Sequence, residues 1–153
     1  MNILVVCQTN RDMSPMAAHY LAHLCKNNNL PEVIVSSAAI EVEPETTIAP
    51  EAVEIMEVYG VDIKEHTPTN LTDEMLENAE MILVPSAKIQ KQLTKLNKGC
   101  SSKIRKIISF IEDKDAEAPV AEDFDSFEQY FISIMPELVE LATGVLRAKF
   151  SMR

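Results

Sequence analysis

Glycine is scarce in this chain: only Gly60, Gly99 and Gly144 occur among its 153 residues, and none precedes position 60. Glycine-rich phosphate loops and dinucleotide-binding fingerprints place several glycines directly after a strand. The sequence therefore excludes both kinds of nucleotide site near its N-terminus.

Basic residues are also few, since 14 Lys and Arg stand against 24 Asp and Glu, for a formal net charge of −10. A strongly acidic chain is repelled by nucleic acid and by anionic membrane surfaces. We therefore expect neither as a partner.

Long apolar runs and paired cysteines are missing as well. No run approaches the ~18 residues of a membrane span, and the apolar stretch before Cys7 is too short and lacks the basic start of a signal peptide. The three cysteines (Cys7, Cys25 and Cys100) form no CxxC pair, and there is no His-rich tract. These absences predict a cytoplasmic protein with free thiols, no metal site and no cofactor.

What is present suits one globular domain. Hydrophobic residues make up 46% of the chain and charged residues 25%, and a domain of this length buries enough surface to fold on its own core. Because no repeat or linker divides the chain, we expect a single domain over residues 1–153.

Apolar runs alternate with helical patterns along the chain. Short apolar runs at 3–6, 33–35, 81–84 and 104–110 predict strands. Helices are expected from Met16 after an N-cap at Ser14, over 49–59, from Thr72, over 89–96, and over 127–150 with a kink or break at Pro136. This order predicts an α/β fold with a four-stranded parallel sheet flanked by helices.

The loop after the first strand is the expected ligand site, because ligands of open α/β sheets bind at the carboxyl ends of the strands. It reads Cys-Gln-Thr-Asn-Arg-Asp-Met-Ser-Pro from Cys7 to Pro15. A cysteine facing a helix N-terminus can be held as a thiolate that attacks phosphorus. An inert core cysteine is the alternative interpretation of Cys7.

From this loop outward, the sequence resembles the low-molecular-weight protein tyrosine phosphatases. Their signature is Cys, five residues, Arg, then Ser or Thr, usually followed by Pro; here "ILVVC" leads into the loop and "SPMA" follows it. "VSSAAI" at 35–40 and "YGVDIKEHTPTNLTDEMLENAEMILV" at 59–84 are similar to two further family segments. An acidic and aromatic region at 119–130 lies where the family carries Asp-Pro-Phe or Asp-Pro-Tyr.

The resemblance implies a set of site residues. Cys7 is the nucleophile, the Ser14 hydroxyl stabilises its thiolate, and Asp123 is the general acid, with Asp125 as the other candidate. The phosphate-binding loop comprises Gln8, Thr9, Asn10, Arg11, Asp12 and Met13. A supporting network of Asn10, Ser14, Ser37 and His66 holds this loop and keeps Asn10 in a left-handed conformation.

Met13 is the decisive departure from the family signature, because it stands where the family has the Arg that grips the phosphoryl oxygens bidentately. Asp12 adds a carboxylate that opposes a dianionic substrate and raises the thiol pKa, and Thr9 replaces a glycine. Arg11 either swings over the mouth of the loop to bind an anion, pairs with Asp12, or belongs to a solvated surface pair.

Charge is unevenly spread along the chain. Six glutamates form a run without any Lys or Arg among them: Glu41, Glu43, Glu45, Glu51, Glu54 and Glu57. Family analogy puts part of this run beside the loop, where it would repel phosphotyrosine. Seven of the 14 basic residues lie in 88–106, and Lys88, Lys91 and Lys95 form either a solvated helix face or a docking patch for an acidic protein partner.

Two functions remain open from the sequence. The first is hydrolysis of a phosphorylated protein or small phosphomonoester through a Cys7 phosphocysteine, weak or absent because the clamping Arg is missing. The second is a catalytically dead pseudophosphatase that keeps the fold as a binding or regulatory module. The oligomeric state is open.

Two other thiol chemistries are disfavoured. A redox enzyme like the arsenate reductases needs further cysteines, but residues 77–87 contain none and Cys100 lies too late. A phosphocysteine carrier of the sugar phosphotransferase type does not explain the matches at Ser37 and His66.

Overall fold

In the computed structural model, which describes residues 1–107 and 124–151, the first strand β1 (Asn2–Cys7) lies inside the sheet. Ile3 and Val5 pack into one apolar cluster, and Leu4 and Val6 pack into a second, because successive side chains of a strand point to opposite faces. The strand is therefore buried on both sides, as its uninterrupted apolar sequence predicts.

The sheet has four parallel strands in the order β2-β1-β3-β4. The other strands are β2 (Ile34–Ala39), β3 (Met81–Val84) and β4 (Ile104–Lys106). Leu4 pairs with Ser36 on one side and with Ile82 on the other. The predicted α/β fold with a four-stranded parallel sheet is confirmed; residues 108–110 of the fourth predicted run lie outside the described residues.

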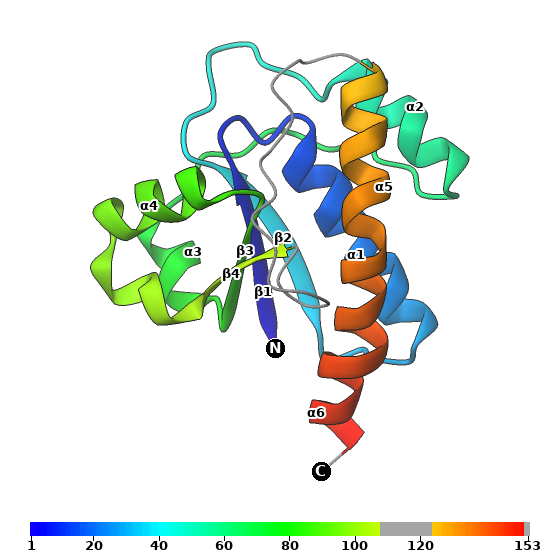
Figure 1. Ribbon diagram of the computed structural model, residues 1–153. Coiled ribbons are helices and arrows are strands. Elements are labelled where there is room, and N and C mark those ends of the chain that lie inside the picture. Colours follow the sequence, from blue (N-terminus) through cyan, green and yellow to red (C-terminus); the bar gives the residue numbers. More distant parts are fainter. Residues whose placement is uncertain (108–123, 152–153) are drawn as a thin grey trace.

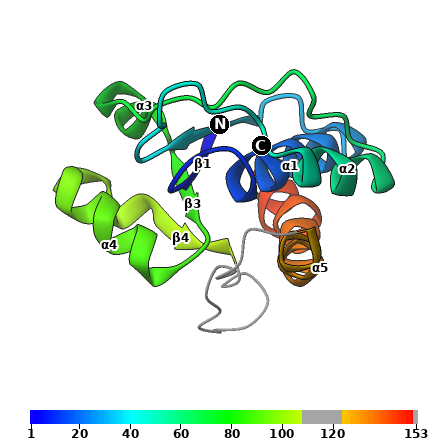
Figure 2. The same cartoon turned by 90° about the horizontal axis from the view of Figure 1, so that it is seen from above.

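Helices cover both faces of this sheet (Figures 1 and 2). One side carries α1 (Met13–Asn27), α2 (Pro50–Val58) and α5 (Phe124–Glu140), and the other carries α3 (Asp73–Asn78) and α4 (Ala87–Leu96). A 3-10 helix (Lys98–Lys103) precedes β4, and a π-helical turn (Leu141–Leu146) leads from α5 into α6 (Arg147–Ser151). None of the helices in the described ranges is long and apolar enough to cross a membrane.

The larger apolar cluster is centred on aromatic contacts between three helical segments. Phe131 of α5 is fully buried and meets Tyr20 and Tyr59 edge-on, with ring centroids 5.1 and 4.9 Å apart. The helix containing Phe131 continues through Pro136 as far as Glu140, so Pro136 does not break the helix in two.

Candidate active site

The loop of residues 8–12 joins β1 to α1 at the carboxyl end of the sheet, at the top of Figure 1. Helix α1 begins at Met13, and its N-cap is Asp12, whose side chain accepts a hydrogen bond from the Met13 amide. The expectation that Ser14 caps this helix is therefore wrong. Because Asp12 takes the cap position, the Ser14 hydroxyl is available to Cys7.

Cys7 ends β1 with a fully buried side chain. Its sulfur lies 2.9 Å from Ser14 Oγ and accepts a hydrogen bond from the Asn10 amide at 3.3 Å. Because Asn10 Nδ2 donates to Ser14 Oγ at 2.7 Å, the Ser14 hydroxyl keeps its own hydrogen, which it can donate to an ionised Cys7 sulfur. Two donors thus point at the sulfur, an arrangement that favours its ionised form.

Asn10 holds the loop together from its interior. It is completely buried and has a left-handed φ of 55°. Its Nδ2 also donates to Ser37 Oγ at 2.9 Å, and its Oδ1 accepts from the Thr69 amide at 3.0 Å and lies 3.1 Å from His66 Nε2. The structure therefore brings Asn10, Ser14, Ser37 and His66 together. Sequence reasoning missed Thr69, because its contribution is a backbone amide.

Replacing Asn10 by Ala should lower the free energy of unfolding by about 2–4 kcal/mol, since the change strains a left-handed residue and leaves buried partners unsatisfied. Asn29 is a matched control, because its φ is 56° but its side chain is exposed. Asn29→Ala should cost only the conformational part, roughly 1 kcal/mol. Urea denaturation measures both losses; equal losses would show that the network adds no stability.

Electrostatics at the loop oppose a Cys7 thiolate. Burial raises the pKa of the Cys7 thiol, and the Asp12 carboxylate raises it further, whereas hydrogen bonds from Ser14 and Asn10 lower it. Asp12 is only 2% exposed, so solvent screens its charge poorly. The net effect is a pKa above that of an ordinary cysteine, which favours the neutral thiol over the thiolate.

Met13 and Arg11 both turn toward other parts of the molecule. Met13 packs against the larger apolar cluster. Arg11 directs Nε toward the Thr47 carbonyl at 3.4 Å. It lines a hollow of about 430 Å³ together with Thr9, Glu43, Glu45, Thr46 and Thr47. The guanidinium therefore lies over the segment that follows β2.

The acidic segment that follows β2 is hydrogen-bonded directly to the loop. Backbone amides of Ile40, Glu41 and Ala49 donate to carbonyls of residues 7–11, and the two segments lie close together above the sheet (Figure 1). Glu43 and Glu45 line the same hollow as two loop residues. Their negative field opposes the approach of a dianionic ligand.

Tyr130 of α5 is a buried residue near the loop that sequence reasoning missed. Burial raises the pKa of its hydroxyl, and the nearby Cys7 and Asp12 raise it further. The hydroxyl finds no hydrogen-bond partner within the part of the chain that the structure describes. In the sequence Tyr130 falls between Phe127 and Phe131 of an apolar helix face, so it is indistinguishable from core.

The two candidates for the general acid are placed differently. Asp123 lies outside the described residues. Asp125 is exposed in the first turn of α5. The choice between them stays a prediction.

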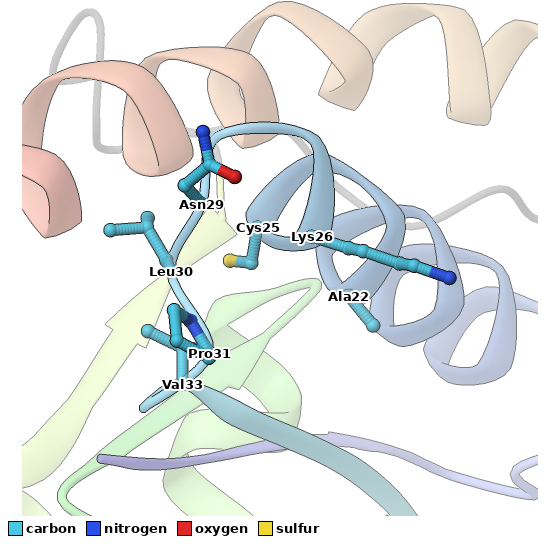
Figure 3. Close-up of a pocket in the computed structure, with 7 residues that line it drawn as sticks. All are labelled: Ala22, Cys25, Lys26, Asn29, Leu30, Pro31 and Val33. Atoms are coloured by element: carbon cyan, nitrogen blue, oxygen red, sulfur yellow. The ribbon is translucent and has the colours of Figure 1, made fainter.

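A separate hollow lies at the far end of α1, away from the loop (Figure 3). It has a volume of about 400 Å³ and is lined by Ala22, Cys25, Lys26, Asn29, Leu30, Pro31 and Val33. Burial raises the pKa of Cys25 to about 11, and the Lys26 side chain extends away from its sulfur (Figure 3). Cys25 is therefore a neutral thiol at neutral pH and a poor nucleophile.

Comparison with known proteins establishes the family. The model of the family described as "Low molecular weight phosphotyrosine protein phosphatase" matches residues 2–150. The chain belongs to this family. A curated relative, "Probable low molecular weight protein-tyrosine-phosphatase EpsP" from Ralstonia nicotianae, is 31% identical over 127 residues, which are 83% of each chain.

Solved structures of low-molecular-weight phosphatases share the fold. The YwlE arginine phosphatase from Geobacillus stearothermophilus has a TM-score of 0.85 at 20% identity, over 99% of this chain and 97% of the other. The tyrosine phosphatase Wzb from Escherichia coli K30, in complex with sulphate, has a TM-score of 0.81 at 20% identity, over 94% and 97%. These two likenesses show the fold, and the family resemblance seen in the sequence is confirmed by the family model and the curated relative.

Proposed function

We propose that this low-molecular-weight phosphatase hydrolyses phosphotyrosine weakly or not at all, and that its fold acts as a binding or regulatory module. One observation carries the proposal: a carboxylate, Asp12, is buried in the same loop as the fully buried Cys7, so that burial first and this charge second raise the pKa of the Cys7 thiol. The sequence adds that Met13 stands at the position that the family signature gives to the phosphate-gripping Arg.

The size of the defect follows from the chemistry of phosphoryl transfer. A positioned donor to the charge that develops in the transition state contributes roughly 3–4 kcal/mol, or a factor of about 10²–10³ in rate. Asp12 lowers the rate of phosphoryl transfer in two ways. Its charge repels a phosphoryl dianion, and it favours the protonated form of the nucleophile. Both effects lower the rate without disturbing the fold.

A slow phosphatase is the second candidate, and the contacts of Cys7 with Ser14 and Asn10 favour it. In that reaction the Cys7 sulfur attacks phosphorus, an S–P bond forms, and the P–O bond to the phenol breaks. The departing phenolate takes its proton from Asp123 or Asp125. Water then hydrolyses the phosphocysteine, which releases phosphate and regenerates the thiolate.

Hydrolysis of p-nitrophenyl phosphate by the unaltered protein and by Cys7→Ala separates the two candidates. We expect the two rates to agree within about tenfold, because the missing clamp and the protonated thiol leave little for Cys7 to do. An unaltered rate more than about 10³-fold above that of Cys7→Ala would overturn the binding-module proposal and support the slow phosphatase.

The exposed lysines of α4 are a candidate for the partner-binding part of such a module. Lys88, Lys91 and Lys95 are all exposed, and α4 packs on the side of the sheet opposite α1 (Figure 2). An acidic protein partner in the cytoplasm would fit this face. Weaker binding at higher salt would be the mark of such a partner.

A further inference from the structure

Two histidines meet behind the loop although they lie far apart in the sequence. His19 of α1 places Nε2 at 3.4 Å from Nδ1 of His66, with the rings edge-on at 88° and their centroids 5.4 Å apart. The third histidine, His23, lies one helical turn beyond His19, and its Nε2 is 3.2 Å from Asn27 Nδ2.

Hydrogen bonding fixes the proton on His66. Its Nε2 lies 3.1 Å from both the Asn10 carbonyl oxygen and Asn10 Oδ1. Both atoms are acceptors, so Nε2 carries the hydrogen and Nδ1 presents a lone pair toward His19. Metal-bound histidines show the same pattern, with one ring N–H donated to a backbone carbonyl or carboxylate and the other nitrogen on the metal.

The spacing and surroundings of the pair also fit a metal ion. Zinc–nitrogen bonds of about 2.0–2.1 Å in a tetrahedral site put two ligand nitrogens roughly 3.3–3.4 Å apart. A hollow of about 260 Å³ opens onto both rings and is also lined by Ser36, Thr67 and Thr69. Both rings are half-buried, and burial lowers the pKa of each, which favours the neutral form that a metal ligand requires.

We propose that His19 Nε2 and His66 Nδ1 together bind a divalent transition-metal ion of the Zn²⁺, Co²⁺ or Ni²⁺ class. His19 then carries its proton on Nδ1, so that both facing nitrogens offer lone pairs, and water molecules in the hollow complete the coordination. No group of three or more His, Cys, Asp or Glu side chains gathers in the described ranges, so this is a site with two protein ligands. The proposal does not depend on whether Cys7 is catalytically active.

A metal ion at this place would act on the loop. Coordination of His66 Nδ1 makes Nε2–H a stronger donor, and this N–H contacts Asn10, whose amide and side chain reach Cys7 and Ser14. The ion would thus rigidify the network that surrounds the Cys7 sulfur. The sequence gives no sign of the site, because no short motif joins the two histidines.

The test is a titration of tag-free protein in the Cys7→Ser background, which removes a competing sulfur ligand. ZnCl₂ is followed by calorimetry, and CoCl₂ by the visible absorption of the bound ion. We expect one saturable site, weakened at least about tenfold in His19→Ala and in His66→Ala. His23→Ala is the matched control and should bind as the parent does.

Three results would overturn the proposal: no saturable binding in the parent, unchanged binding in His19→Ala, or an equal loss in His23→Ala. Because His66 also supports the loop, its variant can lose binding through misfolding. His19→Ala therefore decides the outcome, with circular dichroism to show that this variant is folded.

Discussion

Replacing Met13 by Arg should raise kcat/KM for p-nitrophenyl phosphate by about 10²–10³-fold. The change restores a planar guanidinium where the family signature has one, and its fork can hold two phosphoryl oxygens at once. Met13 is half-buried at the start of α1, so the aliphatic stem of Arg can take over its packing. In the rest of the loop, the side chains of Cys7, Asn10 and Ser14 are already in contact.

Two substitutions at the same position serve as controls. Met13→Lys adds the charge without the fork and should give a much smaller gain, and Met13→Leu should give none. Combining Met13→Arg with Cys7→Ala should abolish the gain. A folded Met13→Arg protein without any gain would contradict the account, since the defect would then lie in the acid or in the loop backbone.

Replacing Asp12 by Asn should lower the pKa of the Cys7 thiol. Removing a negative charge beside the sulfur favours the ionised form, so the thiolate appears at lower pH than in the unaltered protein. The pKa should stay above that of an ordinary cysteine, because burial is the larger cause of the shift. Asn is as good an N-cap as Asp, so the start of α1 is preserved.

The ultraviolet absorbance of the thiolate, followed against pH, measures this shift in the pKa of Cys7. The titration of Cys7→Ala contains the signals of Cys25 and Cys100 and is subtracted as the blank. Asp62→Asn is the matched control, because Asp62 is exposed and pairs with Lys64 on the surface. It should leave the Cys7 titration unchanged. An unchanged Cys7 titration in Asp12→Asn would show that the Asp12 charge does not reach the sulfur.

The sheet was predictable from the sequence because its strands are buried on both faces. Short uninterrupted apolar runs such as Ile3–Val6 and Met81–Val84 are typical of strands buried on both faces and are too short for a buried helix. The start of α1 was less certain, because Asp12 and Ser14 are both good caps and Pro15 is tolerated anywhere in a first turn. Only the folded loop shows that the Ser14 hydroxyl is hydrogen-bonded to the side chains of Cys7 and Asn10.

The candidate site was predictable only where the residues lie in one segment or match a family pattern. Other contacts between distant segments could not be predicted, because they depend on how residues 59–70 pack over the loop. His19 is one example, since its partner is 47 positions away. Tyr130 is another, because a hydroxyl beside the loop looks like core when only the helical period is visible.

The most direct test of a limit at residues 12 and 13 is kcat/KM for p-nitrophenyl phosphate. It is measured in the unaltered protein, in Met13→Arg, in Asp12→Asn and in the double variant. If residues 12 and 13 limit phosphoryl chemistry, the unaltered protein is the slowest. The double variant then exceeds Met13→Arg, because residue 12 no longer neutralises the new guanidinium or raises the pKa of the Cys7 thiol. An unaltered protein as fast as the double variant would contradict the account.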